Sequence, residues 1–320
     1  MSRVRILNEG DVRRFLPMGD CIETMAEVLA ALARDELFNP LRTIAFPPGE
    51  RSGIGLMPSF RSGDNSLYAL KTICVVPDNP TRGLDTHQGF VALFDGKTGQ
   101  TKALMNASAI TEIRTAAVSG VATRLLARPD SSTLAILGAG TQARSHLEAM
   151  RAVLPIEHVR AWSRTPGKAS ELDGVEEVAT AEEAVRGADV VVTATAAREP
   201  ILERRWLADG VHINAVGSSI AAARELDTQT MVDASLFVDR RESTFNEAGD
   251  YLFPLREGAI GPEHIRAEIG EILIGAAEGR TSSSELTVFK SLGIAVEDLA
   301  SAELILGRAE AAGAGVEVDL

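Results

Sequence analysis

The sequence contains little cysteine, few aromatic residues and no long apolar run. Only Cys21 and Cys74 are cysteine among 320 residues, and aromatic residues make up 4%. A disulfide framework is therefore not expected. We expect instead two free, buried thiols in a protein of a reducing compartment. No run of about 18 apolar residues is present, which excludes a transmembrane helix. The N-terminal stretch has no apolar signal-peptide core. We expect a soluble, cytoplasmic protein.

The chain also has fewer basic than acidic residues. The formal net charge is −13, and no block rich in Lys and Arg offsets it. Such a surface is repelled by the phosphates of nucleic acid and by anionic membranes, so neither is an expected partner. The five histidines are scattered and form no metal-binding motif with the cysteines, so no metal is expected. Hydrophobic residues reach 45%, which is typical of a globular protein with sizeable cores.

The first 105 or so residues predict one helix and an antiparallel sheet. The helix covers residues 19–38, and Asp20 with Glu23 three positions later can form a capping box. A hairpin turn is predicted at "DGKTG", from Asp95 to Gly99. The strands are expected at residues 42–46, 55–60 and 66–76 and in the two arms of that hairpin.

Residues 134–238 show a different pattern, in which strands alternate with helices. That alternation predicts a parallel, doubly wound sheet. A further helix, over residues 295–313, is placed to return to the first domain. The predicted strands span residues 133–137, 158–162, 175–178, 190–194, 211–216 and 236–238.

The stretch "LAILGAGTQA" places a glycine-rich loop between a strand and a helix that begins at Thr141. Gly138, Gly140 and Ala143 fit the pattern G-x-G-x-x-A. In this pattern the first residue allows a tight turn, the second lets the backbone approach a pyrophosphate, and the third lets the helix pack on the strand. The free N–H groups of the helix then face the phosphates. We favour a dinucleotide site over a plain turn.

The end of the next strand indicates which dinucleotide is bound. NAD sites usually carry an acidic residue about 20 positions after the loop, which binds the ribose 2′-OH. Here the segment reads Ser163, Arg164 and Thr165. Because no carboxylate repels a 2′-phosphate and a guanidinium can bind one, we predict NADP(H) over NAD(H). The alternative is that Arg164 is a solvated surface residue.

Two later strand ends belong to the same predicted site, because ligands of open α/β sheets bind at the carboxyl ends of the strands. In each segment the alternative is an ordinary turn of small residues. The residues concerned are Thr193 and Thr195 in "VVVTATAA", and Val216, Gly217, Ser218 and Ser219 in "INAVGSS".

Three cations stand alone in apolar or small-residue segments of the chain. They are Arg42, Lys71 and Arg114. A strand or helix residue with such neighbours is half-buried or buried, and a buried cation needs an anionic partner. Each one could form a structural ion pair. Together, beside a nicotinamide domain, they suit a small carboxylic acid, because Arg binds a carboxylate through two parallel hydrogen bonds.

These segments resemble the ornithine cyclodeaminase/μ-crystallin family. The matching pieces, in the family's order, are "PLRT", "LKT", "NPTRGLDTHQGFVALFDGKTG", "ITEIRTAAVSGVAT", "LAILGAGTQARSHL", "INAVGSS" and "TVFKSLGIAVEDLASAELI". They span about residues 40–305. The resemblance implies a homodimer. It also implies an α/β fold in which a Rossmann-type, NAD(P)-binding domain (116–297) is inserted in an α+β substrate and dimerisation domain (1–115 with 298–320).

The resemblance also implies roles for individual residues. Arg42, Lys71 and Arg114 match the positions that hold the substrate carboxylate. Cofactor contacts are implied for Thr86, Gln142, Thr195, Val216 and Ser291. These residues join the cofactor site already expected at the glycine loop with Thr141, at Gly217 and at the segment Ser163–Thr165.

Ser219 departs from part of the family. Members that cyclise ornithine carry an aspartate here for acid/base chemistry, and a hydroxyl is a poor general base. The chain is therefore closer to the reductase side of the family. We expect an NADPH-dependent reductase of a small 2-imino acid, such as pyrroline-2-carboxylate or piperideine-2-carboxylate. Lys71 would bind the substrate or deliver the proton, and Ser219 would orient a water or the substrate. The alternatives are an ornithine cyclodeaminase, an alanine-type dehydrogenase and a non-catalytic NADPH-binding protein.

Overall fold

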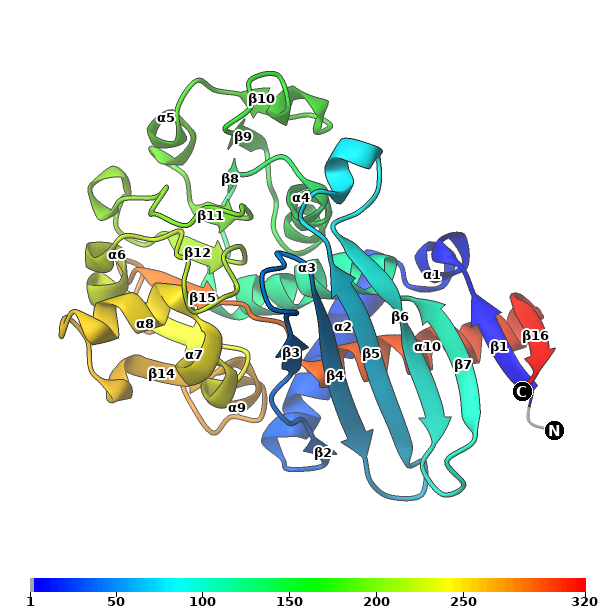
Figure 1. Cartoon of the computed structure of the whole chain (residues 1–320). Coiled ribbons are helices and arrows are strands. Elements are labelled where there is room, and N and C mark those ends of the chain that lie inside the picture. The colour runs from blue at the N-terminus through cyan, green and yellow to red at the C-terminus, as the bar shows by residue number, and fades with distance from the viewer. Residues whose placement is uncertain (1–2) are drawn as a thin grey trace. The chain divides into compact units, whose positions relative to one another are not determined.

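The computed structural model describes residues 3–320, apart from the side chain of Pro80. The chain forms two compact units (Figure 1). Unit 1 runs to Arg114 and resumes at Gly293, and unit 2 is the continuous segment Thr115–Leu292. The boundaries expected from the sequence, 115/116 and 297/298, lie slightly further along the chain. The second differs because residues between them, such as Ala295 and Val296, bond to Ser59 and Asn39 of unit 1.

Unit 1 is built on one mixed sheet. Its strand order is β16-β1-β7-β6-β5-β4-β2, with β3 paired to β4, and β1–β7 is its parallel pair. The strands are β1 (Arg3–Leu7), β2 (Leu37–Phe38), β3 (Thr43–Ala45), β4 (Gly53–Arg61), β5 (Leu67–Val75), β6 (His87–Asp95), β7 (Thr101–Asn106) and β16 (Val316–Asp319). The helical segments are α1 (Glu9–Phe15), α2 (Met18–Ala33), η1 (Asn79–Arg82), α10 (Ala295–Ala312) and the first turns of α3 (Ala107–Leu126).

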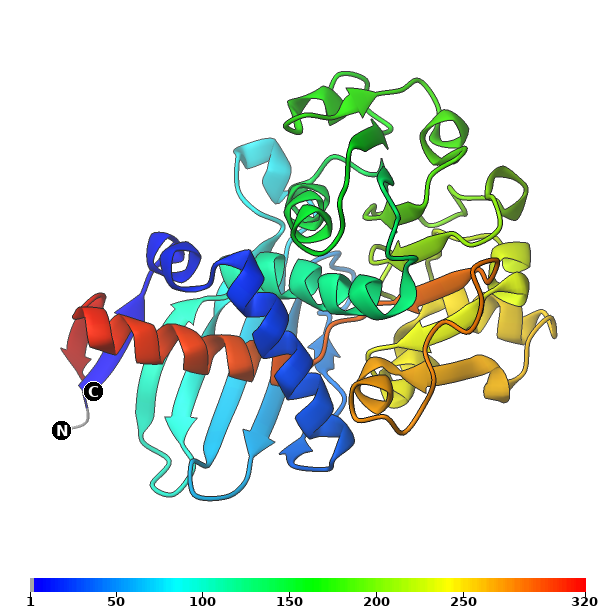
Figure 2. The same cartoon turned by 180° about the vertical axis from the view of Figure 1, so that it is seen from behind.

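The two faces of this sheet differ. Helices α2 and α10 pack together and cross one face (Figure 2). Strand β4 alternates strictly, so that Met57 and Ser59 are buried while Ile54 and Leu56 are exposed. Because side chains of a strand point to opposite faces in turn, β4, β5 and the start of β6 present a second, apolar face away from the helices. We call it the outer face, and it comprises Ile54, Leu56, Pro58, Phe60, Tyr68, Leu70 and Phe90.

Three local expectations for unit 1 are wrong. The helix expected over residues 19–38 ends at Ala33, and Leu37–Phe38 form β2 instead. Helix α2 begins at Met18 after Pro17, without a side-chain cap, so Asp20 lies inside its first turn. The fixed φ of Pro17 starts the helix two residues before the expected cap. Both cysteines are free, and Cys21 is buried as expected, but Cys74 is exposed. The alternation of β5 turns Cys74 toward the outer face, as it does Tyr68.

The hairpin of β6 and β7 is confirmed. The Asp95 side chain accepts hydrogen bonds from the backbone N–H groups of Lys97 and Thr98, and Gly99 adopts φ +71°. A short acceptor side chain followed by a left-handed glycine is the sequence signal that identified this turn.

Unit 2 is a doubly wound sheet in which every pair is parallel, in the order β10-β9-β8-β11-β12-β15-β13-β14. The strands are β8 (Thr133–Leu137), β9 (His158–Trp162), β10 (Glu176–Glu177), β11 (Val190–Thr193), β12 (His212–Ala215), β13 (Ser235–Val238), β14 (Ile265–Glu268) and β15 (Thr287–Lys290). The helices are the rest of α3, then α4 (Thr141–Val153), α5 (Ala181–Val185), α6 (Thr228–Asp233), α7 (Arg241–Glu247), α8 (Gly249–Arg256) and α9 (Ile269–Leu273). Short turns are η2 (Ala169–Glu171), η3 (Arg204–Trp206) and η4 (Pro262–His264).

This topology confirms the expected α/β fold. From β8 the chain winds out through β9 to β10, then returns to the other side of β8 with β11 and β12. The order reverses between β8 and β11, and ligands of open α/β sheets bind at the carboxyl edge of such a switch point. Strands β8 and β9 have the bounds that the sequence predicted, and helix α4 begins at the predicted Thr141.

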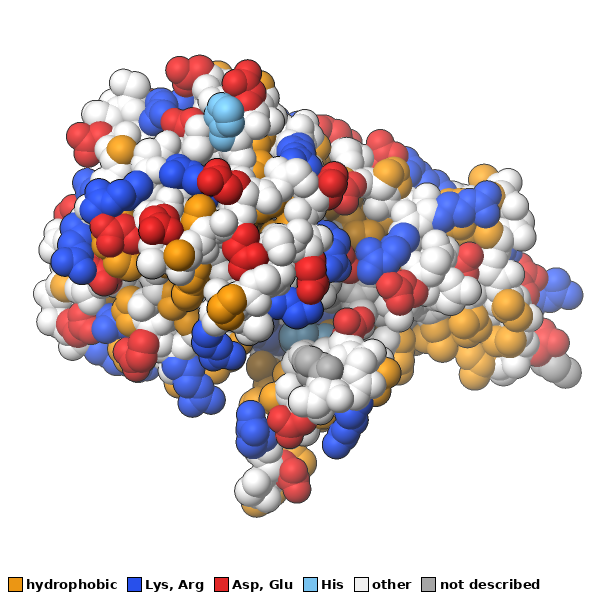
Figure 3. Space-filling model, turned by 90° about the horizontal axis from the view of Figure 1, so that it is seen from above, with side chains coloured by type: hydrophobic (Ala, Val, Ile, Leu, Met, Phe, Trp, Pro, Cys, Tyr) orange, Lys and Arg blue, Asp and Glu red, His pale blue; other side chains and the backbone are white. Residues whose placement is uncertain are grey.

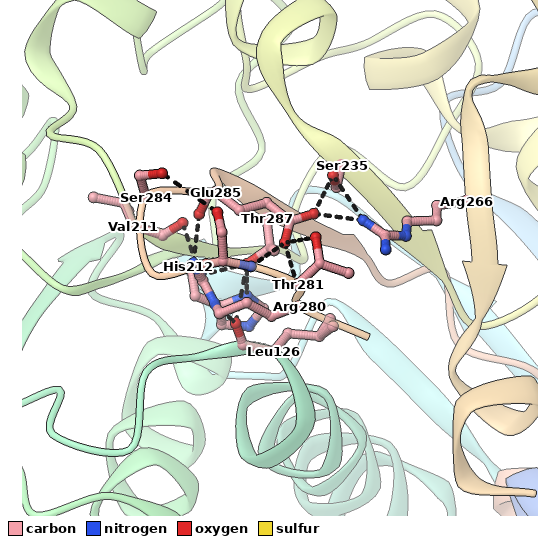
Figure 4. A network of polar contacts seen from close by, with 11 residues as sticks. Leu126, Val211, His212, Ser235, Arg266, Arg280, Thr281, Ser284, Glu285 and Thr287 are labelled. Carbon is pink, nitrogen blue, oxygen red and sulfur yellow. Dashed lines mark hydrogen bonds and ion pairs between the residues drawn. The ribbon is translucent and has the colours of Figure 1, made fainter. Parts of the chain in front are cut away.

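The amino edge of the unit 2 sheet is held by a polar network (Figure 4). Arg280 donates to the carbonyls of Leu126 and Glu285 and to the hydroxyl of Thr287. The Glu285 carboxylate accepts from Ser235 and pairs with Arg266. This network lies at the starts of β12, β13 and β15, the opposite edge from the switch point.

Charges of both signs are interspersed on the face of the molecule shown in Figure 3. Within residues 3–320, no helix is both long enough and apolar enough to cross a membrane. Over the same residues, no group of three His, Cys, Asp or Glu side chains is arranged to hold a metal ion.

Candidate active site

The glycine loop lies at the carboxyl edge of unit 2, between β8 and α4. Gly138 has φ +131°, and a Cβ atom there would lie 2.5 Å from the carbonyl oxygen of Ala194. Only glycine permits this close approach of the loops that follow β8 and β11. The first glycine of the motif therefore serves the tight turn that the sequence indicated.

Gly140 leaves the start of α4 open. It is the N-cap, it offers no capping side chain, and a Cβ atom built there would meet nothing within 4 Å. The first turn of α4, from Thr141, carries no acidic residue, and Ala143 is buried against the unit. The Gln142 Oε1 atom is buried and has no protein partner. An uncapped 13-residue helix with free N–H groups beside a glycine cradle fits the pyrophosphate of a dinucleotide.

The segment Ser163–Thr165 follows β9 and is held by local bonds. The Ser163 hydroxyl donates to the carbonyl of Thr165 at 2.6 Å. Glu177 of β10 accepts from the backbone N–H groups of Gly167 and Ser170, which fixes the rest of the loop. Arg164 is exposed. The fold thus presents one cationic side chain on a short, braced loop at the end of β9.

Glu225 is a buried carboxylate at the same edge that sequence analysis missed. Its oxygens accept from the Thr193 hydroxyl, the Thr195 backbone N–H and the Thr195 hydroxyl, each at 2.7 Å. Burial raises the pKa of Glu225 to about 7, and the charge of Asp250 raises it as well, against the lowering effect of Lys290.

Lys290 and Asp250 complete this buried group. The Lys290 ammonium lies 2.9 Å from Asp250 and donates to the carbonyl of Gly217 at 2.8 Å. Asp250 in turn accepts from the backbone N–H groups of Glu225 and Leu226. A lysine that ends the apolar strand β15 was the available sequence signal for this pair, since a buried cation needs an anion.

The loop after β12 is strained and closely packed. Ser218 has φ +50°, an uncommon value for a residue with a side chain, and its hydroxyl donates to the carbonyl of Ala197. Val216 is nearly buried, and Ser219 is half-buried one residue beyond Ser218. Ser291, directly after β15, is buried and donates from its backbone N–H to Ala215.

In unit 1, Lys71 is the centre of a second buried cluster. It lies on the helix-facing side of β5, and only 2% of it is exposed. Its ammonium lies 2.8 Å from a carboxylate oxygen of Asp298, at the start of α10. Burial and the charge of Arg114 lower the pKa of Lys71 to about 8, against the raising effect of Asp298.

Arg114 joins the same cluster from α3. Its Nε lies 3.2 Å from Asp298, and its Nη1 lies 2.5 Å from Glu297. Two cations and two carboxylates therefore balance in a dry environment. Gly293, with φ +73°, makes room for this arrangement, because a Cβ atom there would lie 2.2 Å from Arg114 Nη1. Asp298 and Glu297 were absent from the predicted site, although "ED" stood in the quoted C-terminal segment.

The remaining predicted residues of unit 1 are Arg42 and Thr86. Arg42 is half-buried just before β3. Thr86 is half-buried just before β6, where its carbonyl accepts from the backbone N–H of Val76. The structure thus brings Lys71 and Arg114 together through Asp298.

Comparison with known proteins agrees with the fold. Residues 4–313 match the ornithine cyclodeaminase/mu-crystallin family. The match covers nearly the whole chain, and the chain belongs to this family.

Three relatives illustrate what this family contains. Ketimine reductase mu-crystallin of Mus musculus is 41% identical over 274 residues, 84% of each chain. The structure of Thermococcus litoralis Delta(1)-pyrroline-2-carboxylate reductase, in complex with NADH and L-proline, has 37% identity and a TM-score of 0.95, and covers 98% of this chain and 100% of that one. An archaeal alanine dehydrogenase dimer with bound NAD has 31% identity and a TM-score of 0.94, over the whole of both chains.

Proposed function

We propose that this protein reduces a small 2-imino acid to the amino acid with NADPH. The substrate would be a cyclic ketimine such as pyrroline-2-carboxylate or piperideine-2-carboxylate. The observation that carries the proposal is the buried Lys71–Asp298 pair, because it holds a buried ammonium group whose pKa is lowered to about 8. The names of the mouse and Thermococcus relatives support the same reaction class.

In this proposal Lys71 delivers the proton that imine reduction requires. When bound, the reduced nicotinamide supplies a hydride to the imine carbon. The imine nitrogen gains one proton, from Lys71 directly or through a water, so the product is the amine. An acid with a pKa near the working pH is the most effective proton donor. Asp298 keeps the ammonium in place, and Ser219 orients a water or the substrate.

The substrate carboxylate is assigned to Arg42 and Arg114. A guanidinium binds a carboxylate through two parallel N–H···O bonds, which fixes the orientation of the acid. Glu297 and Asp298 hold the plane of the Arg114 guanidinium by its Nη1 and Nε atoms. Holding the reacting groups in the correct orientation can lower the activation free energy of the reduction by roughly several kcal/mol.

The cofactor preference is proposed to be NADP(H). The glycine loop and the start of α4 would hold the pyrophosphate through Gly138, Gly140, Thr141, Gln142 and Ala143. Arg164 would bind the 2′-phosphate, with Ser163 and Thr165 beside it, because the braced loop carries a guanidinium where NAD enzymes carry an acid. Further cofactor contacts are assigned to Thr86, Thr195, Val216, Gly217 and Ser291.

We also propose that the protein is a homodimer through the outer face of unit 1. Ile54, Leu56, Tyr68 and Phe90 are all more than a third exposed on adjacent strands. A contiguous apolar surface of this kind marks an interaction site, and a second copy of the chain is the partner that the dimeric archaeal relative suggests.

The experiment is a cofactor-oxidation assay. Purified protein is mixed with NADPH and Δ¹-pyrroline-2-carboxylate or Δ¹-piperideine-2-carboxylate, and the loss of NADPH absorbance is followed. Parallel arms use NADH, and ornithine with NAD⁺. Rapid oxidation with a preference for NADPH is expected. Proline and ammonia from ornithine, without imine reduction, would instead identify a cyclodeaminase. Tight NADPH binding with no turnover in any arm would contradict an enzymatic role.

A further inference from the structure

We propose that Glu225 is a positioning residue of the cofactor site, which fixes the hydroxyl of Thr195 as a hydrogen-bond acceptor. This inference rests on the proposed function, since it concerns the nicotinamide cofactor. Glu225 has no role in the mechanism proposed above. All the residues on which the inference depends belong to unit 2.

The carboxylate of Glu225 accepts three hydrogen bonds and is fully buried. Two of the donors are the hydroxyls of Thr193 and Thr195, and the third is the Thr195 backbone N–H. An ionised carboxylate carries no proton, so it can only accept. The single proton of each hydroxyl must therefore point at Glu225.

This assignment decides what Thr195 can offer to a ligand. Its hydroxyl oxygen has one proton and two lone pairs. The proton goes to Glu225, and one lone pair accepts the backbone N–H of Ala197 at 3.1 Å. The hydroxyl is thus restricted to accepting. The matching group on a nicotinamide dinucleotide is a donor, either a ribose hydroxyl or the carboxamide N–H.

The surrounding glycines place Thr195 and Glu225 at the carboxyl edge of the sheet. A Cβ atom at Gly138 would lie 3.5 Å from the Thr195 methyl group, so Thr195 adjoins the glycine loop. A Cβ atom at Gly217 would lie 2.5 Å from a carboxylate oxygen of Glu225 and 2.2 Å from the Thr195 carbonyl. Gly217 therefore leaves the space through which Glu225 reaches Thr195.

Two charged groups face Glu225. Asp250, on α8, accepts from the Glu225 backbone N–H, and Lys290, on β15, pairs with Asp250. The burial that raises the pKa of Glu225 to about 7 makes its protonation accessible near neutral pH. A Glu225 protonated on Oε1, the oxygen that accepts from Thr195, must donate that proton, so the Thr195 hydroxyl has to turn and release its hydrogen. Protonation would thus remove the fixed acceptor at Thr195.

The first test is a double-mutant cycle on the dissociation constant of NADH, measured by calorimetry for the wild type, E225Q, T195V and the double variant. Each single variant should weaken binding about fivefold, roughly the value of one hydrogen bond. The double variant should be no weaker than the weaker single variant. T195S keeps the hydroxyl and should bind like the wild type. Additive effects, or a T195S variant as weak as T195V, would overturn the proposal.

The second test is the pH dependence of the same constant between about pH 6 and pH 8, around the Glu225 pKa. NADH is the probe because the 2′-phosphate of NADPH itself titrates near pH 6, roughly. Wild-type affinity should rise with pH as Glu225 ionises, by about fivefold. It should be flat in E225Q and T195V. A pH dependence that persists in E225Q would contradict the role of Glu225.

The matched control is E285Q. Glu285 is a carboxylate of the same unit that also accepts from a hydroxyl, but it lies at the amino edge of the sheet (Figure 4). Its thermal unfolding should change while the NADH constant and its pH dependence stay those of the wild type. If the wild type binds neither NADH nor NADPH, both this inference and the proposed function fail. If it binds but the cycle is additive, this inference alone fails.

Discussion

Lys71 and Asp298 are 227 residues apart in the chain and 2.8 Å apart in the fold. Strand β5 brings the ammonium to the helix-facing side of the sheet, and the first turn of α10 brings the carboxylate. Both side chains are withdrawn from solvent, so neither can exchange its partner for water. The pair therefore binds the last helix of the chain to the sheet at the position where we place the proton donor.

Replacing Asp298 by Asn should strongly destabilise unit 1. The substitution leaves Lys71 and Arg114 buried beside one carboxylate instead of two, and breaking a buried pair typically costs about 3–5 kcal/mol. Urea unfolding of D298N measures this free energy. The control is E303Q on the same helix, which breaks the partly exposed Arg61–Glu303 pair and should cost roughly 1 kcal/mol or less. Equal losses in the two variants would contradict the buried role of Asp298.

Replacing Lys71 by Met should abolish most of the turnover. Met keeps the length and apolar stem but has no proton, and loss of a general acid lowers the rate about 10²–10⁴-fold. In the wild type the acid form exists below the lowered pKa of about 8, so kcat should fall as pH rises through that value. In K71M the residual rate should lose this dependence. K102M, at an exposed lysine of β7, is the control and should match the wild type.

Replacing Arg164 by Ala should weaken NADPH binding about tenfold, which is roughly the value of a charge-assisted hydrogen bond. NADH has no 2′-phosphate, so its dissociation constant should stay the same. K168A removes another cation of the same exposed segment and serves as the control. Equal weakening of NADPH and NADH in R164A would show that Arg164 does not read the phosphate.

His146 should make the protein sensitive to acid. Its Nδ1 lies 2.7 Å from the carbonyl of Gln142 and its Nε2 lies 2.9 Å from the Ser119 hydroxyl, so the neutral ring is satisfied. Burial lowers the pKa of His146 from 6.5 to about 4. Between these two pKa values the histidine is protonated in the unfolded chain but neutral in the folded one. The free energy of unfolding therefore decreases by roughly 3 kcal/mol as the pH falls from about 6.5 to 4.

The measurement is the free energy of urea unfolding at neutral pH and near pH 4.5, roughly the lower end of that window. H146Q should be less stable than the wild type at neutral pH but lose less on acidification. His212 is also buried and has a pKa lowered to about 3, so part of the acid sensitivity should remain in H146Q. H158Q, at an exposed histidine, should follow the wild-type curve. An unchanged acid response in H146Q would refute the assignment.

Replacing Leu56 by Asp should convert the proposed dimer to monomers. The substitution puts a charge in the middle of the outer face, where a buried, unpaired carboxylate is strongly unfavourable. Sedimentation velocity measures the mass. V232D is the matched control, because Val232 on α6 is also 37% exposed but lies outside the outer face. A dimer that persists in L56D, or one that V232D also breaks, would exclude this interface.

Local sequence signals predicted the parts of the fold that depend on local chemistry. The glycines of "GAGTQA", the strand before them and the helix after them carry their conformation in residue type, so their bounds were predictable. The first strand, β1, was not predicted. It is held by β7 on one side and by β16, the last strand, on the other. Pairing between the two ends of a chain leaves no pattern in either segment alone.

The residues of the candidate site likewise differ in whether local sequence signals predicted them. Arg42, Lys71 and Arg114 stood out because each was an isolated cation among apolar residues. Glu225 lies in "ARELD", whose charged neighbours resemble an ordinary solvated turn. Its burial depends on Gly217 leaving space and on Asp250 capping its backbone, and both come from other parts of the chain. Such a residue can be recognised only once the loops are placed in three dimensions.

The division of unit 1 between the two ends of the chain has a consequence for synthesis. A ribosome completes unit 2, which is one continuous segment, before residues 293–320 have been made. Until then Lys71 and Arg114 have neither Asp298 nor Glu297, and β1 lacks β16. Domains generally fold as units while the chain emerges, at about 5–20 residues per second. Unit 2 is thus ready first, and unit 1 matures only after residues 293–320 have been made.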